Sequence, residues 1–165
     1  MQLQYDKVPT RKDISGFLNM YLENELSFMD LHNYGDEYFV CENDELELND
    51  NLILHILSDI VGTPLNVENY PSADLVKRLI RMLSETQSEI KELVEYKLCY
   101  DNNKKGLAYL LTDYSKGEYK RLEEYIREKF NLRMGDFPFQ EIIRGASESP
   151  DENIKLIENT CPNTR

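Results

Sequence analysis

The sequence predicts a mainly α-helical protein, built as a single-domain bundle of five or six helices with one small β-hairpin near residues 37–48. Three observations support this fold class. Apolar residues recur every three or four positions along most of the 165-residue chain. Helix-starting patterns precede several of these runs. Strand-like stretches are confined to residues 37–42 and 45–48, which pair across Asn43 and Asp44 in the predicted hairpin.

The first helix is expected over residues 11–31. Thr10 and Asp13 form the T-x-x-D pattern of a capping box at its start. Its buried face is predicted from an apolar stripe at helical spacing. The stripe consists of Ile14, Phe17, Leu18, Tyr21, Leu22, Leu26 and Met29.

Two further helices are expected in the middle of the chain. Asp50 is the predicted N-cap of a helix over residues 51–61, which Gly62 terminates. A longer helical pattern covers residues 73–100. It is compatible with one helix of about 28 residues, or with two shorter helices separated by a break at residues 84–88, and the pattern alone leaves both open.

The C-terminal third has shorter patterns. Residues 107–111 form an apolar run compatible with helix or strand, and Ser115 with Glu118 forms the pattern of a capping box. The helix that follows this box is expected to reach Gly135, with a short helix after it through residue 143. Ser149, Pro150 and Glu152 start the last predicted helix. The domain is expected over residues 1–160, followed by a frayed tail at 161–165.

The charge of the chain lies in one contiguous block. Between Asp13 and Val76 there is no Lys or Arg, and these 64 residues carry fourteen carboxylates, a charge of −14. The rest of the chain sums to +2, giving the net charge of −12. Such a block repels nucleic acid and anionic membrane surfaces, so neither is expected as a direct partner. It favours a basic protein partner.

The remaining composition indicates a cytoplasmic protein. The three cysteines are far apart in the sequence and odd in number, which is typical of free thiols rather than of a disulfide framework. The N-terminal residues lack the apolar core of a signal peptide, and no apolar run is long enough to span a membrane. We expect no cofactor.

Signatures of catalysis are absent, and the sequence predicts a protein that is not an enzyme. His55 and Asp59 lie four residues apart, but on the polar face of a helix, where such a pair is usually a surface contact. The trio Asp30, His32 and Asp36 lacks the spacing of a known metal loop, so no metal site is expected. Cys99 lies beside an apolar stripe and is expected in the core.

Residues 23–50 are the candidate binding segment, because ten of these 28 residues are acidic and four aromatic residues lie among them. Aromatic side chains often anchor protein interfaces, and carboxylates accelerate association with a basic surface. The alternative is that the acidic stretch is a solvated loop. The predicted partner contacts are Tyr34, as an aromatic anchor, with Asp36, Glu37, Tyr38, Glu42, Asp44, Glu45 and Glu47.

Three classes of function fit such a segment. The first is an inhibitor of a basic protein; the protein resembles, in general character, the bacterial immunity proteins (antitoxins) that neutralise nuclease-type toxins by covering a site built to hold phosphate. The second is a mimic of nucleic acid that inhibits a defence or DNA-binding enzyme, of the kind carried by phages. The third is a helical adaptor or regulatory subunit of a larger complex. The sequence favours the first, with a toxin domain as the basic partner.

Overall fold

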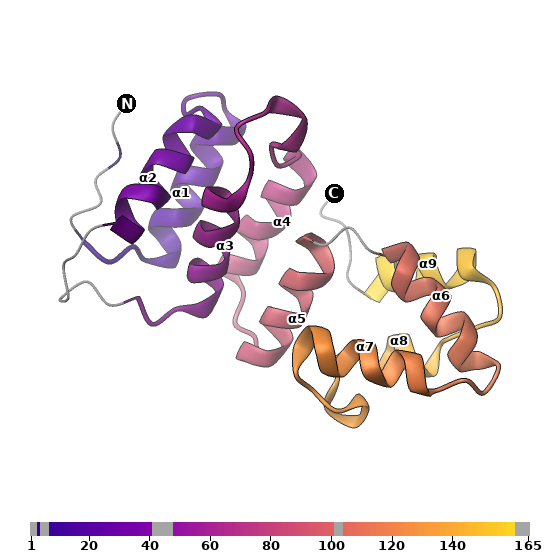
Figure 1. Ribbon diagram of the computed structural model, residues 1–165. Coiled ribbons are helices and arrows are strands. Elements are labelled where there is room, and N and C mark those ends of the chain that lie inside the picture. The colour runs from indigo at the N-terminus through magenta and orange to yellow at the C-terminus, as the bar shows by residue number, and fades with distance from the viewer. Residues whose placement is uncertain (1–2, 4–6, 41–47, 101–103, 161–165) are drawn as a thin grey trace. The chain divides into compact units, whose positions relative to one another are not determined.

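The mainly α-helical fold class is confirmed by the computed structural model of the chain (Figure 1). Within the residues that the structure describes, it has nine α-helices, two 3₁₀ turns and no strand. None of the described helices is long and apolar enough to cross a membrane. The described residues are 3, 7–40, 48–100 and 104–160, without the side chains of Val40, Cys99 and Tyr100.

The chain divides into two compact units. Unit 1 is Met1–Gln87 and unit 2 is Ser88–Asn163. The expectation of a single domain over residues 1–160 stays a prediction, and the tail at 161–165 lies outside the described residues.

Unit 1 is built from four α-helices and one 3₁₀ turn. Helix α1 packs on α4, and α2 packs on α3 (Figure 1). Each of the four helices has an apolar stripe, and all four therefore contribute buried side chains to the core of unit 1. The elements are α1 (Arg11–Leu22), α2 (Phe28–Val40), α3 (Asn51–Gly62), η1 (Val67–Asn69) and α4 (Ala73–Ser84).

The helix predicted over residues 11–31 is two helices. The capping box of Thr10 and Asp13 starts α1 as expected. Helix α1 ends because Asn24 adopts a left-handed conformation, with φ of 60°, and the next amide, that of Glu25, donates to the carbonyl oxygen of Met20 at 2.8 Å. This is the Schellman arrangement that satisfies the last carbonyl groups of a helix, and Asn tolerates the positive φ.

The predicted hairpin is wrong in its first strand. Residues 37–40 form the last turn of α2, so the apolar residues that suggested a strand lie on a helix. Their burial follows helical spacing: Leu31, Tyr34 and Tyr38 are buried, and Phe39 is exposed. The second strand, predicted at residues 45–48, falls almost wholly outside the described residues.

Helices α2 and α3 approach closely at Gly35. A Cβ atom added to Gly35 would lie 2.8 Å from Val61 Cγ2, so only glycine fits there without a shift. One turn earlier on α2, the Nε2–H of His32 donates to the carbonyl oxygen of Val61 at 3.2 Å. This bond satisfies one of the last carbonyl groups of α3 and fixes the end of α3 against α2.

We expect Gly35→Ala to lower the free energy of unfolding by about 1–2 kcal/mol, although Ala is the better helix former. The reason is that the β-branched Val61 has little rotamer freedom with which to move aside. Urea unfolding followed by far-UV circular dichroism measures the change. Gly16→Ala on α1 is the matched control, since nothing lies within 4 Å of its added Cβ, and it should stabilise by about 0.5–1 kcal/mol. Equal stabilisation by both substitutions would contradict the close approach.

Unit 2 contains the other five α-helices. Its core is formed by apolar side chains from all of them, among them Val94, Leu111, Ile126, Ile142 and Ile157. Helix α6 packs on α7 and α9, and α8 packs on α9. The elements are α5 (Glu89–Tyr100), α6 (Lys104–Ser115), α7 (Lys120–Phe130), η2 (Met134–Asp136), α8 (Gln140–Arg144) and α9 (Pro150–Thr160).

The sequence left open whether residues 73–100 form one helix or two, and whether residues 107–111 form helix or strand. The structure answers both questions. The pattern over residues 73–100 is two helices, because α4 ends at Ser84 and the Ser88 hydroxyl accepts from the Lys91 amide at 3.3 Å at the start of α5. The apolar run at 107–111 lies inside helix α6.

The predicted capping box of Ser115 and Glu118 is wrong, because these residues end α6 instead of starting α7. Gly117 has a φ of 94°, and the Glu118 amide donates to the Asp113 carbonyl oxygen at 3.0 Å. Only the glycine between them adopts this conformation without strain, and a Schellman motif results. The start predicted for the last helix is confirmed, since the Ser149 hydroxyl accepts from the Glu152 amide at 3.4 Å.

Candidate partner-binding surface

Three carboxylates of the acidic block, which is residues 13–76, accept hydrogen bonds at the N-termini of helices and stabilise them. Asp13 and Asp30 each close a capping box, with Thr10 and Ser27 respectively. Backbone hydrogen bonds from these two N-cap residues lower the pKa of both carboxyl groups. Asp50 caps α3 and also binds Arg11. These three side chains therefore have structural partners within unit 1.

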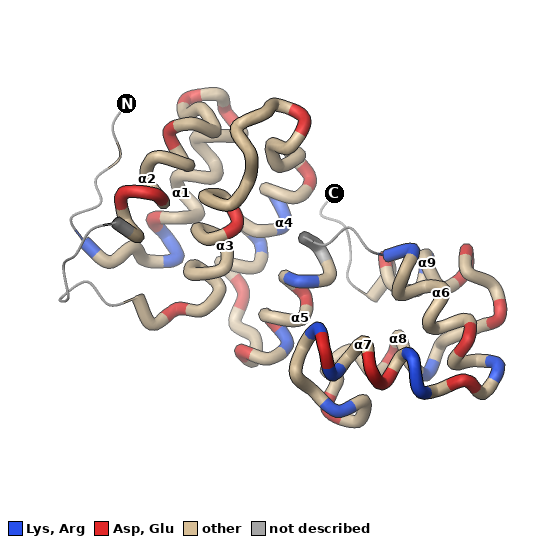
Figure 2. Tube along the Cα trace, in the orientation of Figure 1, with Lys and Arg blue, Asp and Glu red and all other residues tan. Residues whose placement is uncertain are grey.

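Five other carboxylates of the block are exposed, and within the described part of the chain they make no hydrogen bond or ion pair. They lie on the turn between α1 and α2, near the end of α2, and on η1 (Figure 2). Sixteen acidic and six basic residues give unit 1 a net charge of −10, and its Lys and Arg residues lie near its start and on α4. The five side chains are those of Glu23, Glu25, Asp36, Glu37 and Glu68.

One side of α2 faces solvent, and we call it the outer face of α2. It consists of Met29, Asn33, Asp36, Glu37 and Phe39, all exposed. The two large apolar side chains at its ends, Met29 and Phe39, are each 42% exposed. Exposed apolar groups beside exposed charges are typical of a surface that another protein covers.

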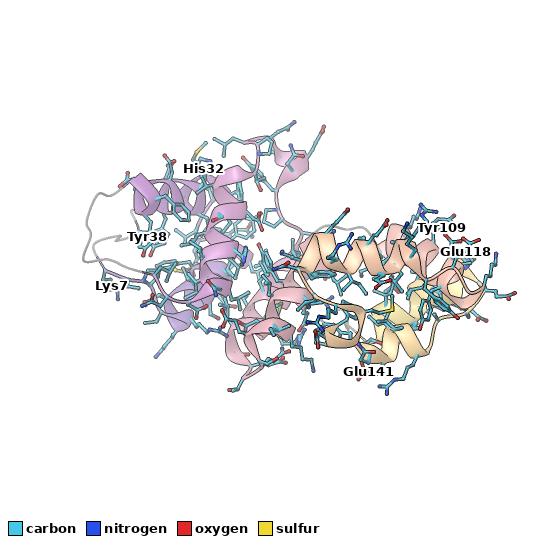
Figure 3. All side chains as sticks on the ribbon, turned by 60° about the horizontal axis from the view of Figure 1, so that its bottom comes forward. Lys7, His32, Tyr38, Tyr109, Glu118 and Glu141 are labelled. Carbon is cyan, nitrogen blue, oxygen red and sulfur yellow. The ribbon has the colours of Figure 1, made fainter. Side chains whose placement is uncertain are left out.

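The structure separates the predicted contact residues into three groups. Asp36 and Glu37 lie on the outer face of α2, as a docking role requires. Tyr34 and Tyr38 are buried, at 4% and 8% exposure, so neither side chain is presented to a partner in this structure. Figure 3 labels Tyr38 on α2 together with His32. The remaining four, Glu42, Asp44, Glu45 and Glu47, lie outside the described residues.

Tyr34 belongs to the core of unit 1. Its ring lies 5.0 Å from the ring of Phe17 in an edge-to-face arrangement, which joins α2 to α1. Burial raises the pKa of its hydroxyl group to about 12. Phe39 is the aromatic residue that the outer face of α2 exposes. The strand predicted over residues 37–42 did not indicate this, because side chains alternate along a strand with a period different from that of a helix.

The residues considered for metal binding do not converge on one position in the described part of the chain. Asp30 bonds Ser27, and His32 bonds Val61, so these two side chains do not converge with Asp36 on a metal position. Within the described residues no group of three or more His, Cys, Asp or Glu side chains is placed to hold a metal ion. His55 and Asp59 are half-buried on α3. The side chain of Cys99 lies outside the described part.

Comparison with known proteins identifies no relative. No protein family, no curated protein and no solved structure matches the chain.

Proposed function

We propose that this protein is an inhibitor that binds a basic protein through the acidic surface of unit 1. The observation that carries the proposal is the set of exposed carboxylates, Asp36 and Glu37 among them, that make no hydrogen bond or ion pair within the described residues, in a stretch that contains no Lys or Arg. Ordinary surfaces mix both signs of charge, because unmixed charge repels itself and destabilises the compact state. The positive charges of a basic partner attract these carboxylates and so offset the repulsion between them.

The specific form of the proposal is an immunity protein that neutralises a nuclease-type toxin in the cytoplasm. A protein that handles nucleic acid holds phosphate groups with Lys and Arg side chains, and carboxylates are natural ligands for the same side chains. Covering such a site needs no catalysis and no cofactor. A standard interface of about 1,600 Å² would suffice.

The proposed contacts are Asp36 and Glu37 together with the acidic residues that follow α2. These are Glu42, Asp44, Glu45 and Glu47. In this proposal Tyr34 and Tyr38 hold α2 in place from the core, since both are buried. They orient the surface without touching the partner.

Reversing the charge of Asp44, Glu45 and Glu47 to Lys tests the proposal. We expect the association rate constant for the basic partner to fall by about 10- to 10³-fold at low salt, because complementary charge accelerates encounter. The basic protein that the wild type captures is immobilised, and surface plasmon resonance measures the association rate constant of each variant with it. The folding stability should be unchanged or slightly raised, since the variant relieves self-repulsion.

A triple reversal in unit 2, Glu118→Lys, Glu123→Lys and Glu128→Lys, is the matched control. It makes the same change in net charge, and its three carboxylates, those of Glu118, Glu123 and Glu128, are exposed in the structure. The association rate constant should fall much less, because these carboxylates lie outside the acidic block. Equal losses for the two triple variants would mean that net charge alone governs binding, and would contradict a dedicated surface.

A further inference from the structure

We propose that the outer face of α2 is the contact surface for a basic amphipathic helix of the partner. The inference rests on the proposed function and goes beyond it, because it names the occupant of the surface. Met29 and Phe39 supply apolar contacts at the two ends, and Asp36 and Glu37 supply the charge between them. The helical rise separates the two apolar residues by about 15 Å along the axis.

The position of the two carboxylates within α2 supports this inference. Asp36 and Glu37 lie towards the C-terminal end of the helix, and α2 has no basic residue in its last turn. The negative end of the helix dipole makes a carboxylate unfavourable there. Four more acidic residues follow in the sequence before Asp50. A cation supplied from outside would offset this local cost.

The shape of the surface favours a helix as the occupant. A segment that binds by strand addition needs a sheet edge, and the described part of unit 1 contains no strand. A convex helix face packs instead against the side of a second helix, with axes about 8–10 Å apart. The occupant should therefore present apolar side chains at both ends of about three turns, with Lys or Arg between them. Anionic lipid and nucleic acid are disfavoured by the charge.

The proposal is tested with a synthetic peptide of about 18 residues, made of Leu, Lys and Ala in an amphipathic helical pattern. Its affinity is measured by fluorescence anisotropy at about 50 mM and about 300 mM salt. We expect Met29→Ser with Phe39→Ser to weaken binding about 10-fold or more at both salt concentrations. Asp36→Asn with Glu37→Gln should weaken it about 10-fold at low salt and little at high salt, because screening removes the charge contribution.

Each variant has a matched control on unit 1. Val67→Ser removes an apolar side chain that is 76% exposed on η1, and Glu23→Gln with Glu25→Gln removes two exposed carboxylates on the α1–α2 turn. Both controls should bind the peptide within about twofold of the wild type. A peptide of equal composition with a scrambled, non-amphipathic order should bind at least about 10-fold more weakly.

The outcomes distinguish this inference from the proposed function. If the controls weaken binding as much as the outer-face variants, or if the scrambled peptide binds equally well, the outer face has no special role and the inference is wrong. A wild type that captures a basic protein but does not bind the amphipathic peptide also overturns the inference, while the proposed function stands. If the wild type binds neither the peptide nor any basic protein, both are wrong.

Discussion

Replacing Asn153 is expected to destabilise unit 2 more than any other single polar substitution in it. Asn153 is fully buried on α9, and its amide group bonds both helix α6 and the loop before α9. Its Nδ2 group lies 2.9–3.2 Å from the Ala108 carbonyl oxygen, the Thr112 hydroxyl and the Ser147 carbonyl oxygen, and its Oδ1 accepts from the Ser147 amide at 2.8 Å. Helix α9 is thereby held to α6 and to the loop that precedes it.

Asn153→Asp isolates the role of the amide, because the two side chains have nearly the same shape. We expect the free energy of unfolding to fall by about 2–4 kcal/mol at pH 7, since a buried carboxylate then faces two carbonyl oxygen atoms. Burial raises the pKa of the new carboxyl group above its unfolded value of about 3.9. The destabilisation should therefore be greatest above the folded pKa and shrink as the pH falls towards about 4.

Urea unfolding by circular dichroism, with hydrogen exchange of peptides from residues 104–160, measures this effect in unit 2. Asn159→Asp is the matched control, because it adds the same charge to the same helix at an exposed position. It should cost no more than about 0.5 kcal/mol. An Asn153→Asp variant as stable as Asn159→Asp at pH 7 would show that the buried amide network does not form.

Replacing Asp50 by Ala is expected to cost about 2 kcal/mol in unit 1, because this carboxylate has two roles. Its Oδ1 accepts from the amides of Leu52 and Ile53 at 3.1 and 3.3 Å, which caps α3. Its Oδ2 accepts from Arg11 Nε at 2.7 Å, and Arg11 also donates from a second nitrogen to Oδ1 at 3.3 Å. The pair joins the first turn of α1 to the start of α3.

Asp50→Asn separates the two roles, because Asn is also a good N-cap but carries no charge. We expect it to lose about half as much stability as Asp50→Ala in urea unfolding. Arg11→Ala combined with Asp50→Asn should add little to the loss from Arg11→Ala alone, since both remove the same ion pair. Glu25→Ala, which removes an exposed carboxylate that makes no hydrogen bond or ion pair with a described residue, should leave stability within about 0.5 kcal/mol. Additive losses for Arg11 and Asp50 would contradict the ion pair.

The sequence correctly predicted the helices whose capping residues and apolar spacing both match the way the helices pack. Helix α3 was predicted to within one residue because Asp50 caps it, and it continues through Gly62 to the C-cap Thr63. The mainly helical class followed from the apolar spacing. The prediction erred where a single residue in a left-handed conformation ends a helix. Asn24 divides residues 11–31, and Gly117 turns a capping-box pattern into a helix end.

The candidate surface was predicted only in part. The acidity of the block and the capping roles of Asp13 and Asp50 were predicted from the sequence. The capping box of Asp30 with Ser27 and the ion pair of Asp50 with Arg11 were found only in the structure. Assigning residues 37–40 to a strand hid which aromatic residue is exposed. With the helical period of α2 known, Phe39 moves to the outer face and Tyr34 to the core.

Capture of the partner from cell extract at low salt tests the central claim most directly. Tagged wild-type protein and the variant with Asp44, Glu45 and Glu47 reversed to Lys are compared side by side, with bound proteins identified by mass spectrometry. We predict that the wild type retains a basic protein in an equal molar amount, and that raised salt releases it. The variant should not retain this protein. If both retain the same protein, or if the wild type retains none, the acidic block is a solvated surface and the proposed function is wrong.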